Sequence, residues 1–261
     1  MGEWDYINNK EGVNKVLKSR VDECAPFENV YTLALRGLHD RAMNASNNMD
    51  DRKKMLQEAL MAQRQMLVDA IGKRAEDIPQ AFTPYKEVLD VYDQGLELPD
   101  DVTIIWPDDN YGYMKRLSSP KEQKRSGRSG VYYHSSYLGK PHDHLWMNTT
   151  SPTLMYEELR KAYDMTADRI WLLNAGDIKS CEFAVDYFLT MAFDIDSFNF
   201  ERAANYRTEW LCGMLGDDYR TEYQDVINSF YKLLSPVNLN LWDGVISGLR
   251  IKHGRERKYG Y

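Results

Sequence analysis

The stretch TIIWPDDNYGYMKRL, residues 103–117, sets an apolar run directly against a group of polar side chains. Residues 103–106 are typical of a short buried strand, and Pro107 ends it. The sequence Asp-Asp-Asn-Tyr follows at 108–111 without a spacer. Because Asp and Asn commonly form turns and cap helices, an ordinary polar turn is one interpretation. The other is one wall of a catalytic or binding pocket.

Four further segments have the same form, an apolar run that leads into polar groups. The sequence predicts strands at about 30–36, 80–83, 103–106, 131–136 and 169–174. Helical patterns lie between them, including an amphipathic stretch at 54–73 and a helix with Ser151 as its N-cap. Strands that alternate with helices are typical of βαβ units and a parallel sheet. After Cys181 only helical patterns follow, at about 181–194, 199–215 and 218–234.

Composition excludes several classes of partner. The chain has 261 residues, of which 43% are hydrophobic and 28% charged, and its net charge is −7. This acidic balance, without a long basic run, argues against a nucleic-acid partner. No apolar stretch is as long as a membrane span, and the N-terminus MGEWDYINNK lacks a signal-peptide pattern. The three scattered cysteines predict neither a disulfide framework nor a metal site, and we expect no cofactor.

Each predicted strand ends in groups that can ionise or form hydrogen bonds. The carboxyl ends of parallel strands share one rim, so these groups are expected to converge. A polar turn explains one such end, but five in succession are harder to explain by turns alone. The groups are Arg36, His39 and Asp40 after the first strand, Tyr85 and Glu87 after the second, Asp108 to Tyr111 after the third, His134 and Tyr137 after the fourth, and Asn174, Asp177 and Lys179 after the fifth.

Such a set of side chains suits glycoside hydrolysis. One carboxylic acid protonates the leaving oxygen, and a second carboxylate activates water or attacks the sugar. An arginine would suit a sugar that itself bears a carboxylate. On chemistry alone, another hydrolase or a lyase fits as well.

Two other motifs favour ordinary surface structure. The sequence HDH at 142–144 could join His134 as a metal site, but its spacing matches no strong zinc pattern, so we expect a surface loop and no metal. The sequence RSGRSG at 125–130 could cradle a phosphate. Because no P-loop Lys-Ser/Thr follows, a flexible connection is favoured.

Four long stretches together resemble glycoside hydrolase family 115: YTLALRGLHD, IPQAFTPYKEVLDVYDQGLELPDDVTIIWPDDNYGYMKRLS, GVYYHSSYLGKPHDHLWMNTTSPTLMYEELRKAY and RIWLLNAGDIKSCEF. The resemblance runs from about Trp4 to about residue 200. That family comprises xylan α-glucuronidases, which remove α-1,2-linked glucuronic acid or its 4-O-methyl ether from xylan. The resemblance implies a (β/α)8 barrel, inversion of the anomeric configuration, a secreted or periplasmic enzyme, and glucuronoxylan or its oligosaccharides as substrate. We also consider a homodimer of the full-length protein.

Carried over by position, the resemblance implies that Asp40 and Glu87 are the catalytic carboxylates, with acid and base unassigned. Inversion would place the two carboxyl groups roughly 6.5–9.5 Å apart. One of the two aspartates at 108 and 109 is expected to cap a following helix. The predicted substrate-binding residues are Arg36, Tyr85, Asp109, Asn110, His134 and Tyr137.

The predicted fold is therefore α/β, a partial (β/α)8 TIM-type barrel of about five parallel βα units followed by an all-helical segment. We place the barrel in residues 1–196 and the helical segment in 197–261. A complete barrel takes about 250 residues, so we expect three or so βα units to be missing and the chain to be part of a longer enzyme. The alternatives are a truncated, non-catalytic carbohydrate-binding or structural remnant, and an enzyme acting on another acidic sugar.

Overall fold

The computed structural model describes residues 3–38, 41–44, 48–138 and 148–236 of the chain. These residues divide into two compact units. The first contains the described residues up to Tyr133 together with Leu159–Leu172. The second contains His134–Glu158 and the described residues from Leu173 on.

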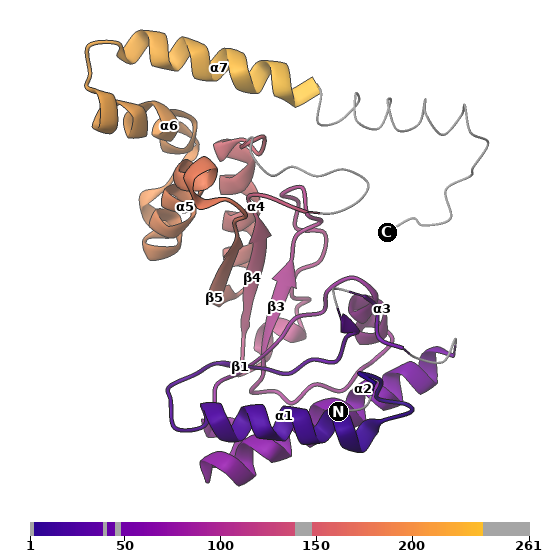
Figure 1. The fold of residues 1–261 in the computed structure, drawn as a ribbon. Helices are drawn as coiled ribbons and strands as arrows, with labels where there is room; N and C mark the ends of the chain where they lie inside the picture. Colours follow the sequence, from indigo (N-terminus) through magenta and orange to yellow (C-terminus); the bar gives the residue numbers. More distant parts are fainter. Residues whose placement is uncertain (1–2, 39–40, 45–47, 139–147, 237–261) are drawn as a thin grey trace, which may run out of the picture. The chain divides into compact units, whose positions relative to one another are not determined.

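One five-stranded sheet forms the frame of the fold (Figure 1). Its strand order follows the chain order, which confirms the predicted succession of parallel βα units. The register pairs Ala81 with Thr103 and Trp106 with Val131. The fold is thus a partial (β/α) barrel followed by helices, as the sequence predicts. The strands are β1 (Tyr31–Thr32), β2 (Gln80–Phe82), β3 (Thr103–Pro107), β4 (Ser129–His134) and β5 (Ala167–Asn174).

The first strand is much shorter than the predicted 30–36. Leu33 still donates its N–H to the carbonyl of Ala81, 2.8 Å away. At Ala34 the ladder stops because the buried side chain of Gln63 takes both backbone groups. Its Oε1 accepts from the Ala34 N–H at 3.0 Å and its Nε2 donates to the Ala34 carbonyl at 2.7 Å. A helix side chain therefore replaces the neighbouring strand at this point.

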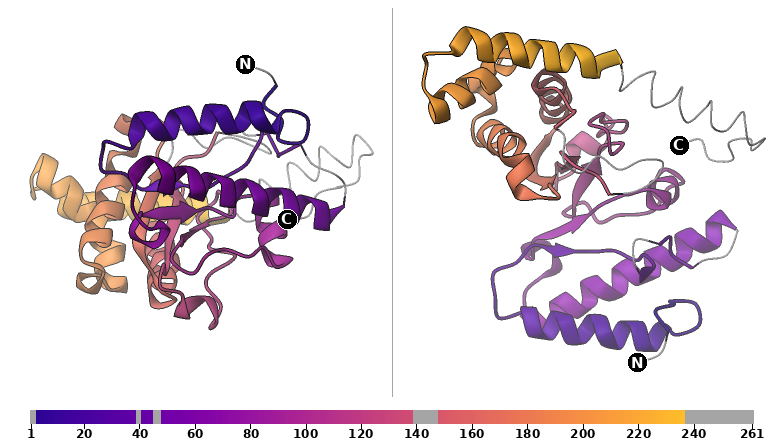
Figure 2. Two further views of the ribbon diagram at one scale, coloured as in Figure 1. Left: turned by 90° about the horizontal axis from the view of Figure 1, so that it is seen from below. Right: turned by 45° about the horizontal axis from the view of Figure 1, so that its top comes forward.

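Helices before and between the strands follow the predicted pattern. Helix α2 ends at Gly72, whose φ of 73° is the left-handed conformation favoured for glycine at helix ends. Helices α1 and α2 lie side by side (Figure 2). The predicted cap of α4 is confirmed, since Ser151 Oγ accepts from the backbone N–H of Leu154 at 3.2 Å. The bounds are α1 Lys10–Cys24, α2 Met49–Ile71, α3 Glu87–Asp93 and α4 Pro152–Asp164.

Three further helices complete the second unit: α5 (Ile178–Phe193), α6 (Phe200–Leu215) and α7 (Arg220–Pro236). They lie where the sequence predicts helices. Arg207 of α6 connects them, because its guanidinium lies 5.0 Å from the ring centre of Phe183 and 5.3 Å from that of Phe230. The same group donates to the hydroxyl of Tyr231 at 2.7 Å. Cation–π contacts and a hydrogen bond thus hold α5, α6 and α7 together.

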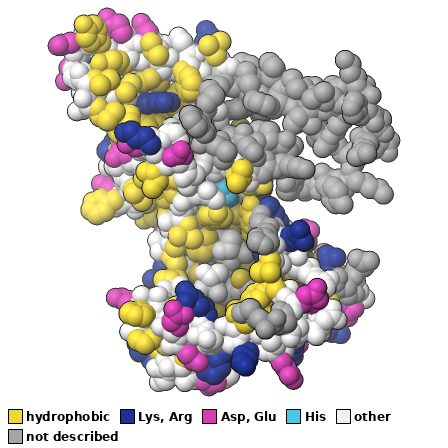
Figure 3. Space-filling model, in the orientation of Figure 1, with side chains coloured by type: hydrophobic (Ala, Val, Ile, Leu, Met, Phe, Trp, Pro, Cys, Tyr) yellow, Lys and Arg dark blue, Asp and Glu magenta, His cyan; other side chains and the backbone are white. Residues whose placement is uncertain are grey.

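Hydrophobic side chains gather on the surface of α6 and α7 (Figure 3). Leu215, Val226 and Leu233 are each more than half exposed. Among the described residues, no helix has both the length and the apolar character needed to cross a bilayer.

The core of the first unit is built around β3. Ile104, Ile105 and Trp106 are almost fully buried. The indole N–H of Trp106 donates to Ser118 Oγ at 2.9 Å, and the Arg116 guanidinium lies 4.5 Å from the centre of the Trp106 ring system. The same guanidinium pairs with Glu122 at 2.8 Å. A buried strand and a charged network are therefore joined through one tryptophan.

The pKa of Glu122 makes this network sensitive to acid. Burial raises the pKa, but hydrogen bonds from Arg116, Ser119 and Tyr92 lower it more, from 4.5 to about 2. Because the folded-state pKa is depressed, the stabilisation is fully present above about pH 4.5 and is lost as the pH falls toward 2.

We predict that Glu122→Gln destabilises the protein at pH 6 and that the difference from the wild type shrinks on acidification toward pH 3. Urea unfolding at a series of pH values measures this. Glu23→Gln is the control, since its carboxylate is 65% exposed and pairs with Arg20 on the same helix. A gap between Glu122→Gln and the wild type that is constant with pH would contradict the account.

Gly130 belongs to β4, so the predicted flexible connection at 125–130 is wrong at its end. A Cβ atom at this position would lie 2.0 Å from the carbonyl oxygen of Ile170 in β5. The glycine is therefore required by the close approach of two backbones.

We predict that Gly130→Ala costs about 3 kcal/mol of unfolding free energy, because a rigid carbonyl has to move. Gly213→Ala in α6 is the matched control, since a Cβ there meets no atom within 4 Å. It should be neutral or stabilising by up to about 1 kcal/mol. Chemical denaturation of both variants tests the assignment, and equal effects would refute it.

Candidate functional site

An arginine–glutamate pair joins the ends of β1 and β2. Arg36 follows β1, and Glu87 is the first residue of α3 after β2. Nε of Arg36 lies 3.1 Å from one carboxylate oxygen of Glu87, and Nη2 lies 3.1 Å from the other. The backbone N–H of Met43 also donates to Glu87, at 3.3 Å. About four-fifths of each charged side chain is buried, so charge-assisted hydrogen bonds fix the carboxylate in place.

Tyr85 extends this pair to the end of β3. The Arg36 guanidinium lies 5.4 Å from the centre of the Tyr85 ring, which is a cation–π distance. The hydroxyl of Tyr85 donates to Oδ1 of Asn110 at 3.2 Å. Asn110 is 5% exposed. The structure thus brings together four predicted site residues, Arg36, Tyr85, Glu87 and Asn110, from the carboxyl ends of three adjacent strands.

The loop after β3 depends on its two aspartates. Asp108 accepts from the backbone N–H groups of Asn110 at 3.1 Å and Gly112 at 3.0 Å. Asp109 accepts from Tyr111 and Tyr113 at 3.0 and 3.1 Å. The expectation that one of the two caps a helix is wrong, because residues 108–118 are irregular. Both carboxylates instead satisfy the N–H groups of the loop that carries Asn110.

Two residues of the site have unusual backbone conformations. Asn110 has a φ of 70°, in the left-handed region that asparagine tolerates. Lys86, directly before Glu87, has φ 53° and ψ −122°. A non-glycine residue in such a conformation costs roughly 1–3 kcal/mol and persists only where surrounding contacts impose it. One of the two positions is Asn110 itself, after β3, and the other directly precedes Glu87, after β2.

The predicted residues His134 and Tyr137 belong to the second unit. Their rings form an edge-to-face pair with centroids 5.7 Å apart, and both are largely buried. Between them, the N–H of Ser135 donates to the carbonyl of Asn174 at 2.9 Å, and Ser136 Oγ accepts from the N–H of Gly176. The ends of β4 and β5 are therefore joined by hydrogen bonds. Lys179, by contrast, is exposed and pairs with Glu182 along α5.

Two predicted groups lie outside the described residues. His39 and Asp40 are among them, so the expected separation between the Asp40 and Glu87 carboxyl groups stays a prediction. The HDH sequence at 142–144 also lies outside. Within the part of the chain that the structure describes, no group of three or more His, Cys, Asp or Glu side chains is arranged to hold a metal ion.

A small hollow lies beside Arg36. The indole N–H of Trp4 donates to the backbone carbonyl of Arg36 at 2.8 Å. Sequence reasoning missed Trp4 and Asp5 because nothing in the local pattern of residues 1–10 marks them. The hollow is lined by Trp4, Asp5, Tyr6, Leu35, Arg36, Gly37, Met43 and Asn44.

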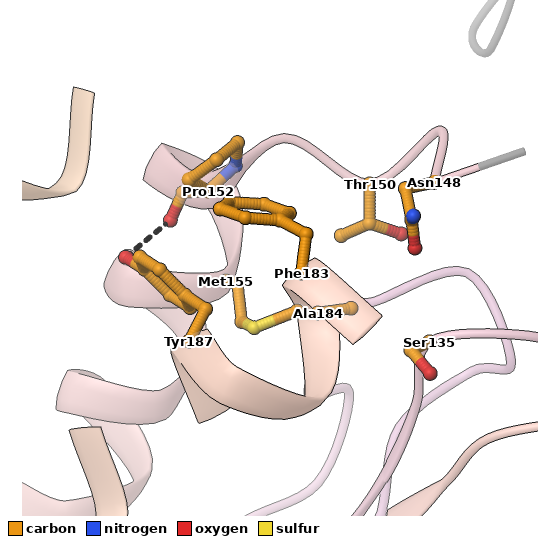
Figure 4. A pocket seen from close by; sticks show the side chains of 8 residues that line it. All are labelled: Ser135, Asn148, Thr150, Pro152, Met155, Phe183, Ala184 and Tyr187. Carbon is orange, nitrogen blue, oxygen red and sulfur yellow. Dashed lines mark hydrogen bonds between the residues drawn. The ribbon is translucent and has the colours of Figure 1, made fainter. Parts of the chain in front are cut away.

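A second small hollow lies within the second unit (Figure 4). Its walls are mostly apolar, with Met155 of α4 facing Phe183 and Tyr187 of α5. The Tyr187 hydroxyl donates to the carbonyl of Pro152 at 2.8 Å, and burial raises the pKa of that hydroxyl. These contacts are typical of packing between two helices.

Comparison with known proteins identifies the family. A model described as Glycosyl hydrolase family 115 matches residues 1–240. The chain belongs to this family. No curated protein matches it.

A solved family 115 structure is similar over most of this chain. It is described as a 4-O-methyl-α-glucuronidase, BtGH115A, with specificity for decorated arabinogalactans. The two chains are 40% identical, with a TM-score of 0.85. The match covers 89% of this family 115 chain but 31% of the solved one, so the chain spans about a third of that relative's length.

We predict that the loop that carries Asn110 in this family 115 chain depends more on Asp108 than on Asp109. Asp108 is 5% exposed, so Asp108→Ala leaves two buried N–H groups without an acceptor, at about 1–3 kcal/mol each. The Asp109 side chain is 23% exposed, and water can replace it in Asp109→Ala. Urea unfolding measures both variants. A larger loss for Asp109→Ala would contradict the described hydrogen bonding.

Proposed function

We propose that the protein is a glycoside hydrolase that removes α-1,2-linked glucuronic acid, or its 4-O-methyl ether, from a polysaccharide. The observation that carries the proposal is the Arg36–Glu87 pair at the carboxyl ends of β1 and β2, in a chain that belongs to family 115. The described activity of the solved relative supports the same sugar.

In the proposed reaction, Glu87 and Asp40 are the two carboxyl groups. One protonates the glycosidic oxygen as the bond to the anomeric carbon breaks, and the other removes a proton from the attacking water. Water then bonds to the face of the sugar opposite the leaving group, and the configuration inverts. The ordered carboxylate of Glu87 supports this role, because the fork from Arg36 and the Met43 N–H fix its direction.

Recognition of the uronic acid is assigned to Arg36 and its neighbours. A guanidinium carries five N–H donors, so Arg36 can form charge-assisted hydrogen bonds with the sugar carboxylate while its Nε and Nη2 keep their bonds to Glu87. Tyr85 and Asn110 would contact sugar hydroxyls, which the hydrogen bond between them supports. The proposed set also includes Asp109, His134 and Tyr137.

Two polysaccharides are candidate substrates. Family resemblance favours glucuronoxylan, whereas the solved relative is specific for decorated arabinogalactans. Both present a uronic acid side chain to the same proposed site, so each has to be assayed. We also propose that residues 1–196 form the catalytic barrel and 197–261 a helical segment.

A non-catalytic role is the second candidate. The chain spans about a third of its solved relative, so a carbohydrate-binding or structural function is compatible with the same family membership. This candidate predicts binding of the polysaccharide, or no interaction, without release of uronic acid.

We predict that the full-length protein releases free uronic acid from glucuronoxylan or from a glucuronosylated arabinogalactan. Glu87→Gln and Asp40→Asn should each lower kcat by about 10²–10⁴-fold, since each removes a general acid or base. Asp100→Asn is the matched control, because this carboxylate precedes β3 and accepts from the backbone N–H of Ser126 at the amino end of the strand. Chromatographic quantification of the released sugar measures all four proteins.

Normal turnover in both Glu87→Gln and Asp40→Asn would refute the assignment. Binding of the polysaccharide without any product from the wild type would favour the non-catalytic candidate. Release from another uronide alone would leave the reaction class intact and change the substrate.

A further inference from the structure

Two adjacent residues near the N-terminus hold both ends of the segment 36–44. Trp4 Nε1 donates to the backbone carbonyl of Arg36 at 2.8 Å. Oδ2 of Asp5 accepts from Nδ2 of Asn44 at 2.6 Å, across 39 positions of sequence. Neither contact is part of a regular element, since α1 begins only at Lys10.

Asp5 accepts several hydrogen bonds besides the one from Asn44. The residue is 8% exposed. Its Oδ1 accepts from the backbone N–H groups of Ile7 at 2.8 Å and Asn8 at 3.1 Å. Its Oδ2 accepts from the side chain of Asn8 at 2.7 Å, in addition to Asn44. Burial raises the pKa of Asp5, but these hydrogen bonds lower it more, so the group is a carboxylate at neutral pH.

The held segment reaches the proposed catalytic carboxylate through its backbone. Met43, the neighbour of Asn44, donates its N–H to Oε1 of Glu87 at 3.3 Å. Within the described residues, Gly37 donates its N–H to the carbonyl of Arg41 at 3.0 Å. A Cβ on Gly37 would lie 2.6 Å from the carbonyl oxygen of Ala42. Because Asn44 and Met43 are neighbours in the chain, a displacement of Asn44 is expected to alter the hydrogen bond from the Met43 N–H to Glu87.

We propose that Asp5 is a positioning residue for Glu87, acting through Asn44 and the backbone N–H of Met43. The proposal rests on the proposed function, in which Glu87 takes part in the reaction. Asp5 itself touches neither substrate nor the reacting atoms. Trp4 assists by holding the backbone of Arg36, the other partner of Glu87.

A purely local role for Asp5 makes a different prediction. The bonds to Ile7 and Asn8 shape the turn before α1 and would exist without any connection to Asn44. Substitution at Asn44 separates the two roles, because it removes the long-range bond and leaves the local turn intact. Asn44 is exposed, so Asn44→Ala creates no cavity.

The test is the steady-state kinetics of Asn44→Ala in the full-length protein. We expect kcat to fall by about 10- to 100-fold, the cost of misplacing a reacting group by around 1 Å. KM should stay within about threefold, because binding of the uronic acid is unaffected when the reaction alone loses alignment. Asn29→Ala is the matched control, since Asn29 donates to the carbonyls of Cys24 and Phe27 ahead of β1. It should keep the wild-type kcat.

A double-mutant cycle tests the pair directly. Asp5→Ala removes the local bonds to Ile7 and Asn8 together with the bond to Asn44, whereas Asn44→Ala removes the long-range bond alone. If the long-range bond positions Glu87, Asn44→Ala should cost little further activity in a chain that already carries Asp5→Ala. A value of kcat for Asn44→Ala within twofold of the wild type, or losses that simply multiply in the double variant, would overturn the proposal.

Amide hydrogen exchange keeps this test separate from the test of the proposed function. If the wild type released no uronic acid from any substrate, the proposed function would fail, but the connection could still be measured. Asn44→Ala should then raise the exchange rate of the Met43 amide at least about tenfold, a loss of protection that local opening produces. Asn29→Ala should not. Unchanged exchange in Asn44→Ala would overturn the positioning role even if the enzyme were active.

Discussion

The bidentate ion pair between Arg36 and Glu87 is the contact on which the arrangement of the polar strand ends depends. It joins residues 51 positions apart, which only the parallel pairing of β1 and β2 brings together. With four-fifths of each side chain buried, either charge alone would be costly to desolvate. The pair therefore holds the segments after β1 and β2 together. Tyr85 contacts its arginine, and the Met43 N–H donates to its glutamate.

Strained backbone at Lys86 and Asn110 complements this pair. Each residue adopts a positive φ immediately beside a side chain of the candidate site. In β3 before the site, Trp106 is fully buried and connects through Ser118 to Ser129. The site is thus supported from the core of β3 as well as by the hydrogen bonds of its own loops.

Local sequence patterns predicted most helices and strands, but not the side chains from distant parts of the chain that contact them. The apolar run at 103–106 and the Ser151-Pro152 cap were sufficient for β3 and α4, because strand burial and capping are local properties. The early end of β1 could not be predicted, since Gln63 of a distant helix takes the backbone groups of Ala34. A sequence pattern carries no signal for such a partner.

For the candidate site too, some features could be predicted from the sequence and others could not. Arg36, Tyr85, Glu87 and Asn110 could be predicted because each follows an apolar run and because the quoted stretches resemble family 115. The structure shows these residues in contact with one another, because the carboxyl ends of adjacent parallel strands lie side by side. The two aspartates after β3 were expected to act differently from one another, yet both bind loop N–H groups, since the direction of the chain after Pro107 is set by tertiary contacts.

In the proposed reaction, two carboxyl groups act with a water molecule on opposite faces of an α-linked uronic acid. Proton NMR of the anomeric signals during the first minutes of hydrolysis by the full-length protein distinguishes inversion from retention. We expect the β-anomer of the free uronic acid to appear first and the α-anomer to grow only by mutarotation. Initial release of the α-anomer, which requires a covalent intermediate on a closer carboxylate pair, would contradict it.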